Sequence, residues 1–304
     1  MILVCGEALF DMFAAETADG FTFEARAAGS PFNVAVGLSR LGAEAGLCTG
    51  VSIDFLGDKL VARLAEEGVA TTYLSRMDRP TTTAYVSLGP DGSATYAFYG
   101  EGAADRSLPL GTDIDLTGVT ALHFGSYSFV VGETADLYLA TMKRAAGSAF
   151  ISYDPNIRPT VEPDMAVWRQ RQAAAAPHCD LIKMSDEDAG FLFPGAALDD
   201  IAARLLNEGA GAVAFTLGAE GAVIHAPGLR ETAAPKAIEV VDTVGAGDSF
   251  QAAFLAKLLT GRSAGAGVPS HEALCEAMRY GVAASAVTCS RAGADLPRAA
   301  DMSA

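Results

Sequence analysis

Short apolar runs and segments with helical periodicity alternate along most of the chain. The apolar runs, which are typical of buried strands, are Ile2–Cys5, Glu44–Val51, Ala121–Phe124, Phe150–Tyr153, Leu181–Met184 and Ala212–Leu217. The helical segments are Val34–Leu41, Leu56–Glu67, Glu133–Ala146, Trp168–Ala176, Gln251–Leu259 and Glu272–Thr288. Strands separated by helices favour right-handed crossovers and a parallel sheet covered on both faces. The pattern predicts an α/β fold whose ligands bind at the carboxyl ends of the strands.

A second kind of pattern occurs in the first third of the chain. Thr82–Leu88 and Ala94–Tyr99 alternate β-forming residues on either side of Gly89–Gly92, which predicts a hairpin. We expect this hairpin and Phe21–Glu24 to form a small sheet that projects from the main body. Ala8–Ala15 extends the first apolar run as a further strand.

The segment 241–250 carries the strongest chemical signal. It predicts a strand end, a turn that contains Gly245 and Gly247, and the beginning of a helix. The first amides of a helix have no partner within the helix and lie at the positive end of its dipole, so this turn can bind an anion. Asp248 adds a carboxylate that can take a proton from a hydroxyl group. Taken alone, the segment also fits a structural turn with an acidic residue in the first helical turn.

The nine residues 242–250 resemble the C-terminal signature of the ribokinase-like, PfkB-type carbohydrate kinases. The resemblance implies that Asp248 is the catalytic base and that the amides of Gly245, Ala246 and Gly247 form the anion hole. It also implies a ribokinase-like three-layer α/β/α core with a mainly parallel sheet. A small β lid, at roughly 12–27 and 80–105, would belong to a single domain that spans 1–304. We expect the helix N-terminus and a nearby metal ion to keep Asp248 ionised without a raised pKa.

The N-terminal part contains the residues that this resemblance assigns to the sugar. Asp11 interrupts an apolar run, where a charge is costly unless it is paired; it is either on the wet face of an edge strand or bound to sugar hydroxyls. Gly29 and Asn33 match the family's N-terminal signature, although Ala28 stands where the first glycine is usual and Phe32 where a small residue is common. These departures leave the identity of the sugar open.

Two further features belong to this region. Ser30 suits a helix N-cap before Pro31, which would leave Asn33 either as a capping residue or as a ligand contact. Arg106 follows the predicted hairpin, and it either returns to the sugar site or remains a solvated charge of the lid.

Strand ends in the second half of the chain supply candidates for the nucleotide site. Residues 216–221 match the family's Thr-x-Gly-x-x-Gly nucleotide loop, which assigns Thr216, Gly218 and Gly221 to ATP. Residues 154–159 resemble the Asp-Pro-Asn-x-Arg segment of fructokinase-like and ketodeoxygluconate-kinase-like members. There Asn156 would bind the nucleotide and Arg158 the substrate or its phosphate, although a plain turn explains the segment too. The resemblance also implies a nucleotide contact for Lys183.

Metal binding is predicted at two places. Residues 183–188 lie where many family members carry an Asn-x-x-Glu motif that organises magnesium, and here Ser185 replaces the asparagine and Asp188 the glutamate. A shorter carboxylate can still hold a metal-bound water, so we expect Mg²⁺ to accompany ATP near Ser185 and Asp188. Asp242 is the candidate ligand of a monovalent cation, K⁺.

Composition and charge exclude several classes of protein. The net charge of −16 argues against a nucleic-acid partner, because phosphate binding requires clustered Lys and Arg. No apolar run approaches the roughly 18 residues of a membrane span, and the N-terminus does not resemble a signal peptide. The five widely spaced cysteines predict buried thiols in a reducing cytoplasm rather than disulfides or a zinc site.

The sequence therefore predicts a cytoplasmic, ATP-dependent sugar kinase, with a homodimer formed through the lid as a further expectation. Fructose is the favoured substrate because Gly6, Glu7 and the segments 30–33, 154–158 and 183–187 resemble the fructokinase branch. 2-Keto-3-deoxygluconate is the alternative, since Arg158 could meet its carboxylate; ribose or a nucleoside comes third. A sugar-binding sensor without turnover is the non-enzymatic alternative, although it would not need Asp248. The first strand is not followed by the G-x-G-x-x-G motif of a dehydrogenase, and no Walker motif is present.

Overall fold

A large sheet forms the centre of the molecule. The computed structural model describes residues 1–88, 94–235, 237–263, 265 and 269–303. Nine strands of this described part form one sheet in the order β13-β12-β11-β10-β9-β8-β1-β4-β5. They are β1 Ile2–Cys5, β4 Ala45–Ser52, β5 Leu74–Met77, β8 Ala121–Gly125, β9 Phe150–Asp154, β10 Leu181–Ser185, β11 Ala212–Thr216, β12 Ala222–Ala226 and β13 Leu229–Ala233. Within this sheet the neighbouring strands β11, β10, β9, β8, β1, β4 and β5 run parallel. In contrast, β12 pairs antiparallel with β11, and β13 pairs antiparallel with β12.

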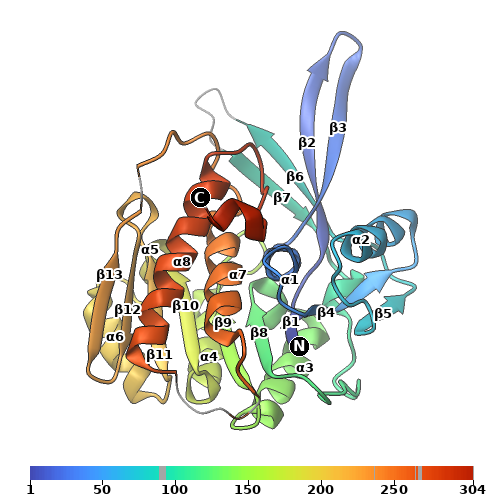
Figure 1. The fold of residues 1–304 in the computed structure, drawn as a ribbon. Helices are drawn as coiled ribbons and strands as arrows, with labels where there is room; N and C mark the ends of the chain where they lie inside the picture. Colours follow the sequence, from blue (N-terminus) through green and yellow to red (C-terminus); the bar gives the residue numbers. More distant parts are fainter. Residues whose placement is uncertain (89–93, 236, 264, 266–268, 304) are drawn as a thin grey trace.

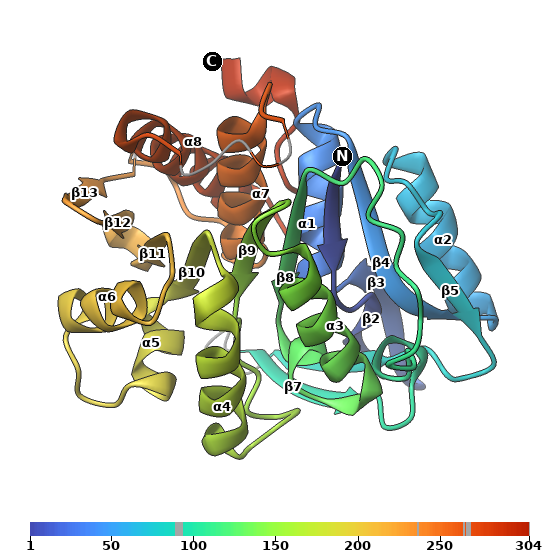
Figure 2. The same cartoon turned by 90° about the horizontal axis from the view of Figure 1, so that it is seen from below.

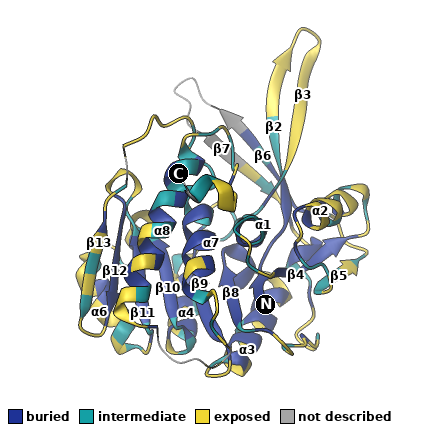
Figure 3. Ribbon diagram, in the orientation of Figure 1, coloured by how far each residue is buried: buried dark blue, intermediate teal, exposed yellow. Residues whose placement is uncertain are grey.

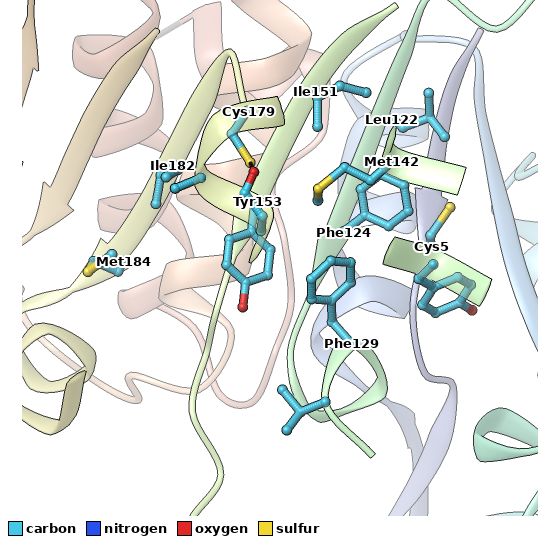
Figure 4. Close-up of a cluster of buried hydrophobic side chains, with 14 of the residues drawn as sticks. Cys5, Leu122, Phe124, Phe129, Met142, Ile151, Tyr153, Cys179, Ile182 and Met184 are labelled. Atoms are coloured by element: carbon cyan, nitrogen blue, oxygen red, sulfur yellow. Dashed lines mark hydrogen bonds between the residues drawn. The ribbon is translucent and has the colours of Figure 1, made fainter. Parts of the chain in front are cut away.

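Helices cover both faces of this sheet, as Figure 2 shows. One face carries α1 Ser30–Arg40, α2 Phe55–Glu66, α7 Ala246–Leu259 and α8 His271–Cys289. The other face carries α3 Gly132–Ala145, α4 Met165–Ala175, α5 Asp186–Leu192 and α6 Leu198–Asn207. Each layer buries its own apolar cluster against the sheet, and Figure 4 shows part of one, where Phe124, Phe129 and Tyr153 pack together. The predicted three-layer α/β/α fold is confirmed.

A second sheet of four strands is separate from the nine-stranded sheet, although Leu9, Ala28 and Ala84 of its strands belong to the core. Its order is β3-β2-β6-β7, with β2 Leu9–Thr17, β3 Gly20–Ala28, β6 Thr83–Leu88 and β7 Ala94–Tyr99. The β2–β3 hairpin projects from the body in Figure 1, and Figure 3 shows that its far end is exposed. The predicted small sheet is therefore present, while the predicted turn Gly89–Gly92 lies outside the described residues. We call these four strands the small sheet.

The position of α7 determines the geometry of the glycine-rich turn. Its residues 249–256 are all buried, because α7 lies between α1 and α8 and is apolar on nearly all sides. A buried polar contact also fixes the helix to the central sheet: Gln251 Nε2 donates to Ser152 Oγ on β9 at 2.7 Å. The segment before the helix differs from expectation, since residues 237–240 form no strand and the helix already begins at Ala246.

Two expectations from composition can be compared with the structure. In the described part of the chain, no helix combines the length and hydropathy needed to cross a membrane. All five cysteines are free; Cys5, Cys48, Cys179 and Cys275 are buried, whereas Cys289 is partly exposed.

Candidate active site

A cavity of about 1520 Å³ lies at the carboxyl ends of the parallel strands, with Phe13, Arg26 and Phe98 of the small sheet along its wall. It brings together the predicted site residues from all parts of the chain, with one exception, Arg106. The residues that line it are Asp11, Gly29, Asn33, Asn156, Arg158, Lys183, Ser185, Asp188, Thr216, Gly218, Gly221, Asp242, Gly245, Ala246, Gly247 and Asp248. Because parallel strands end at the same edge of a sheet, segments far apart in sequence meet here.

The glycine-rich turn presents the beginning of α7 to this cavity. Gly245 is the N-cap and has φ 79°, a left-handed conformation that L side chains avoid. A Cβ at this position would also lie 2.8 Å from the Cβ of Ala294. The Ala246 N–H donates to the Thr243 carbonyl at 3.2 Å, whereas the next helical amides have no partner within the helix. The turn therefore offers backbone donors and a positive helix dipole to an anion.

Asp248 is held by two side chains of α1. Ser30 Oγ donates to Asp248 Oδ1 at 2.7 Å, and Asn33 Nδ2 donates to Asp248 Oδ2 at 2.8 Å. Ser30 is the first residue of α1 and Gly29 is its N-cap, so the predicted capping role of Ser30 is wrong. Both side chains instead fix the orientation of the carboxylate at the beginning of α7.

The pKa of Asp248 differs from the expectation. Burial raises the pKa, while the hydrogen bonds from Ser30 and Asn33 and the charges of Lys183 and Arg158 lower it in part. The net direction is upward. Desolvation therefore outweighs the hydrogen-bond donors and cations around the carboxylate, and the helix N-terminus by itself does not hold the pKa at its ordinary value.

Asp11 and Arg158 lie at the same end of the cavity as Asp248. Burial raises the pKa of Asp11 to about 6; the Arg158 charge lowers it and the Asp248 charge raises it. Arg158 Nη1 donates to the Ile157 carbonyl at 3.0 Å, which fixes its guanidinium at the end of β9. Asn156 precedes it with φ 39°, a conformation that asparagine tolerates better than most residues. This end of the site thus contains the carboxylates of Asp11 and Asp248, and the Arg158 guanidinium is close enough to lower the pKa of both.

A buried ion pair stands behind the glycine-rich turn. Lys183 Nζ donates to Asp154 Oδ2 at 2.8 Å, and only 5% and 3% of the two side chains are exposed. A Cβ placed on Gly247 would lie 3.4 Å from Lys183 Nζ. The ammonium group is therefore next to the anion-binding turn. Burial lowers the pKa of Lys183, but the charge of Asp154 and its hydrogen bond raise the pKa by more, so the lysine stays protonated.

The predicted metal residues are already engaged within the protein. Ser185 and Asp188 form a capping box at the N-terminus of α5. Asp188 accepts from the Ile157 N–H at 2.8 Å through Oδ1 and from Ser185 Oγ at 2.8 Å through Oδ2. Asp242 accepts from the Val244 N–H at 3.0 Å and from the Gly293 N–H at 2.8 Å. Within the described ranges, no three His, Cys, Asp or Glu side chains are grouped so that they could hold a metal ion.

Arg106 lies away from the other predicted residues. Its guanidinium carbon is 4.6 Å from the ring centroid of Tyr127, and its Nε is 3.9 Å from Asp105 Oδ2. Only 14% of its side chain is exposed, so it is not a solvated lid charge. Tyr127 lines the cavity but Arg106 does not, so the structure gives no support to the predicted sugar contact.

Several residues of the site were not found by sequence reasoning. Ser30 and Asp154 act through hydrogen bonds to Asp248 and Lys183, and such contacts across the fold leave no local signal. Glu7 lines the cavity and is buried; burial raises its pKa to about 7, against the hydrogen bonds from Ser126 and Ser128. Its position beside Gly6 was noted as part of the motif, but no role followed from it. Arg26 also lines the cavity.

Comparisons with known proteins agree with this geometry. The profile of the pfkB family carbohydrate kinases matches residues 1–300. A fructokinase of Rhizobium leguminosarum bv. trifolii is 40% identical over 260 residues, which cover 85% of this chain and 79% of the relative. The probable fructokinase-4 of Arabidopsis thaliana is 30% identical over 304 residues, which cover 97% of this chain and 92% of the relative.

Solved structures show the same fold. The fructokinase of Xylella fastidiosa with bound ATP superposes with a TM-score of 0.90 at 26% identity, covering 99% of this chain and 96% of the other. A PfkB protein from Polaromonas sp. JS666 has a TM-score of 0.80 at 28% identity, with 99% and 98% covered. The profile matches nearly the whole chain, and all the predicted site residues except Arg106 line one cavity, which leads to one assignment. The chain belongs to the pfkB family of carbohydrate kinases.

Proposed function

We propose that the enzyme transfers the terminal phosphoryl group of ATP to a hydroxyl group of fructose. The observation that carries the proposal is the position of Asp248. It stands at the N-terminus of α7, is oriented by Ser30 and Asn33, and shares its cavity with Asp11 and the Thr216 loop. The 40% identity with a fructokinase supports fructose as the acceptor.

The geometry suggests a role for each group in the transfer. Asp248 takes the proton of the primary hydroxyl while its oxygen attacks the terminal phosphorus and the bond to the ADP oxygen breaks. The amides of Gly245 and Gly247 and the Lys183 ammonium face the charge that develops on the phosphoryl oxygens. Asp11, Gly29 and Asn33 bind the sugar in this proposal. The raised pKa of Asp248 makes it a stronger base than an exposed aspartate.

The nucleotide would extend from the glycine-rich turn toward the end of β11. Thr216, Gly218 and Gly221 form the wall on that side, and Asn156 and Lys183 lie between them and Asp248 along the strand ends. The solved relative with bound ATP supports this nucleotide. We assign these five residues to ATP.

Magnesium would be bound chiefly by the phosphate oxygens of ATP, whose charge it partly neutralises. Both oxygens of Asp188 accept hydrogen bonds within the protein, and Ser185 Oγ takes part in the same capping box. Their fit is therefore to a water of the magnesium shell rather than to the ion itself. Asp242, which joins two loops beside Gly245, is the proposed neighbour of a K⁺ ion.

The proposal is tested by ADP release from Mg-ATP in the presence of fructose, 2-keto-3-deoxygluconate, ribose, adenosine or no sugar. We expect turnover with fructose at least about tenfold above that with each of the others. Preference for 2-keto-3-deoxygluconate would identify the alternative function, which the Arg158 guanidinium near Asp11 and Asp248 favours by its charge. Sugar binding without ADP release would contradict the kinase proposal.

Ser30→Ala should make the activity more sensitive to acid. Ser30 lowers the pKa of Asp248 by donating to its carboxylate, so its loss lets burial raise that pKa further. Because the base acts when ionised, kcat falls as the pH drops through the pKa of Asp248, and this fall should begin at higher pH in the variant. We therefore expect the loss of kcat in the variant to grow toward the acidic end of a measured pH profile.

Ser39→Ala provides the matched control on the same helix, since Ser39 Oγ donates to the Glu67 carbonyl, outside the cavity. Its profile should follow that of the unmodified enzyme. A loss in Ser30→Ala that is the same at every pH would assign Ser30 a structural role instead.

We propose that 1–304 acts as one domain, that the small sheet is a lid over the sugar, and that two copies associate through its outer face. Neighbouring residues on a strand point to opposite faces, so Phe23 lies opposite the face that carries Arg26 and Phe13. Phe21, Phe23, Tyr85 and Tyr99 form a chain of edge-to-face contacts there. Phe21 and Tyr99 are both 66% exposed, which is unusual for grouped aromatic side chains.

We place the enzyme in the cytoplasm, where its free thiols would remain reduced.

The double variant Phe21→Ser with Phe23→Ser should be monomeric under conditions in which the unmodified enzyme sediments as a dimer. The reason is the loss of apolar area from the proposed interface. Phe55→Ser is the control, because Phe55 is 74% exposed but belongs to α2. A monomeric unmodified enzyme, or a double variant that stays dimeric, would rule out this interface.

A further inference from the structure

Arg26 is a cationic residue of the small sheet that lines the cavity. It lies on β3 directly opposite Asp11 in the β2–β3 register, so the two side chains share the face that looks into the cavity. The cavity is lined by three cations in the described part of the chain: Arg158 and Lys183 come from the ends of core strands, and Arg26 comes from the proposed lid. Eight acidic residues line the same cavity, so its overall charge does not by itself indicate an anionic ligand, and the position of Arg26 beside the anion-binding turn is the informative feature.

The guanidinium of Arg26 is held from one side and free on the other. Its Cζ lies 4.8 Å from the ring centroid of Phe13, and Nε donates to Glu24 Oε1 at 2.8 Å. Among the described residues, Arg26 donates this side-chain hydrogen bond through Nε. Its two Nη atoms can therefore donate to a ligand, and 48% of the side chain is exposed.

These nitrogens point to the neighbourhood of the anion-binding turn. A Cβ on Gly293 would lie 3.0 Å from Arg26 Nη1, and Gly293 has φ 70°, so this position suits glycine on both grounds. The adjacent Ala294 packs on Gly245, the N-cap of α7. The hydrogen bond to Glu24 is the main cause that raises the pKa of Arg26, and the Asp242 charge adds to it. Both Asp242 oxygens accept backbone N–H groups, and the described residues show no ion pair between Asp242 and Arg26, whose ion pair is with Glu24.

We propose that Arg26 binds the terminal phosphoryl group of ATP from the lid side. This inference rests on the proposed function, in which that phosphoryl group lies between the glycine-rich turn and a sugar bound beside Asp11 and Asp248. The phosphoryl group nearest the lid is then the transferred one, while those of ADP lie farther toward Thr216. A guanidinium offers two parallel N–H donors to phosphate oxygens, and Glu24 and Phe13 orient it for that contact.

The test compares ADP with the non-hydrolysable analogue that carries an imido group between the β- and γ-phosphorus, each titrated calorimetrically with Mg²⁺ and without sugar. Arg26→Met keeps an apolar stem over Phe13 but removes the charge and both donors. We expect the Kd of the analogue to rise by about 10- to 100-fold, the size typical of a lost charge-assisted hydrogen bond. The Kd of ADP should change less than about twofold. Arg26→Lys, which keeps the charge without the fork, should fall between.

Glu24→Gln is the matched control, because it weakens the anchor and leaves the guanidinium in place. It should change the Kd of the analogue far less than Arg26→Met does. Equal weakening of the analogue and ADP, or no weakening of either, would overturn the proposal and leave Arg26 as a link between the lid and the Gly293 loop. Because no sugar is present, these outcomes do not depend on fructose being the substrate. An unmodified enzyme that binds both nucleotides but phosphorylates no sugar would refute the proposed function alone.

Discussion

Asp248→Ala is expected to lower kcat by about three orders of magnitude, within the range of about 10²–10⁴ that general base catalysis contributes. The variant removes the one carboxylate at the N-terminus of α7 that Ser30 and Asn33 orient. The amides of the turn and Lys183 remain, so the phosphoryl group can still be bound and some residual turnover should persist. Sugar binding, measured by calorimetry, should change by less than about tenfold, because Asp11 and Asn33 remain in place.

Asp200→Ala controls for the loss of an acidic side chain at the beginning of a helix. Asp200 is exposed in the first turn of α6, and it does not line the cavity. Its kcat should equal that of the unmodified enzyme. If Asp248→Ala kept full turnover, Asp248 could not be the base, and the role of the glycine-rich turn would have to be reassigned.

Lys183→Met should have the second largest effect, and it should act on both activity and stability. The ammonium next to Gly247 faces the transferred phosphoryl group in the proposed mechanism, so we expect kcat/KM for ATP to fall by about 10²- to 10³-fold. The variant also leaves Asp154 buried without its partner. Removing one member of a buried ion pair costs about 3–5 kcal/mol of unfolding free energy. Denaturant unfolding and initial rates measure the two losses separately.

A double variant separates these two roles of the ion pair. Lys183→Met combined with Asp154→Leu removes both charges and fills the space with apolar atoms, which is often neutral or stabilising at buried pairs. We expect the unfolding free energy to return toward that of the unmodified enzyme while kcat/KM stays low. Recovery of activity together with stability would show that Lys183 supports the fold and does not act on the phosphoryl group.

Local sequence signals were sufficient for the fold, and they also named most of the cavity residues to which we assign roles. The strands β8 to β11 were predicted to within about one or two residues, because each is a short apolar run bounded by turns. The segment 242–250 predicted the glycine-rich turn, and Asp11, Asn33 and Lys183 were named as candidate site residues by their place in motifs. The strand end expected at the start of the segment 241–250 is absent, since residues 237–240 form no strand and the helix begins at Ala246.

The pKa of Asp248 and the side-chain contacts of several residues were poorly predicted. The pKa of Asp248 was inferred from its helix position and an expected metal ion, whereas burial of the carboxylate raises it. Arg106 was placed near the sugar by its proximity to the hairpin in sequence, but the chain turns it against Tyr127. Ser185 and Asp188 were interpreted as metal residues, and their immediate use is to cap α5.

The sequence by itself determined the alternation of strands and helices, the turn at Gly245 and the chemical identity of the residues at the strand ends. These depend on periodicity and on backbone preferences that act over a few residues. Only the tertiary structure decided that Ser30 and Asn33 hold Asp248, that Asp154 holds Lys183, and that Arg26 reaches the loop beside Gly245. Those contacts join residues that lie far apart along the chain, and their geometry arises when the layers pack and exclude water.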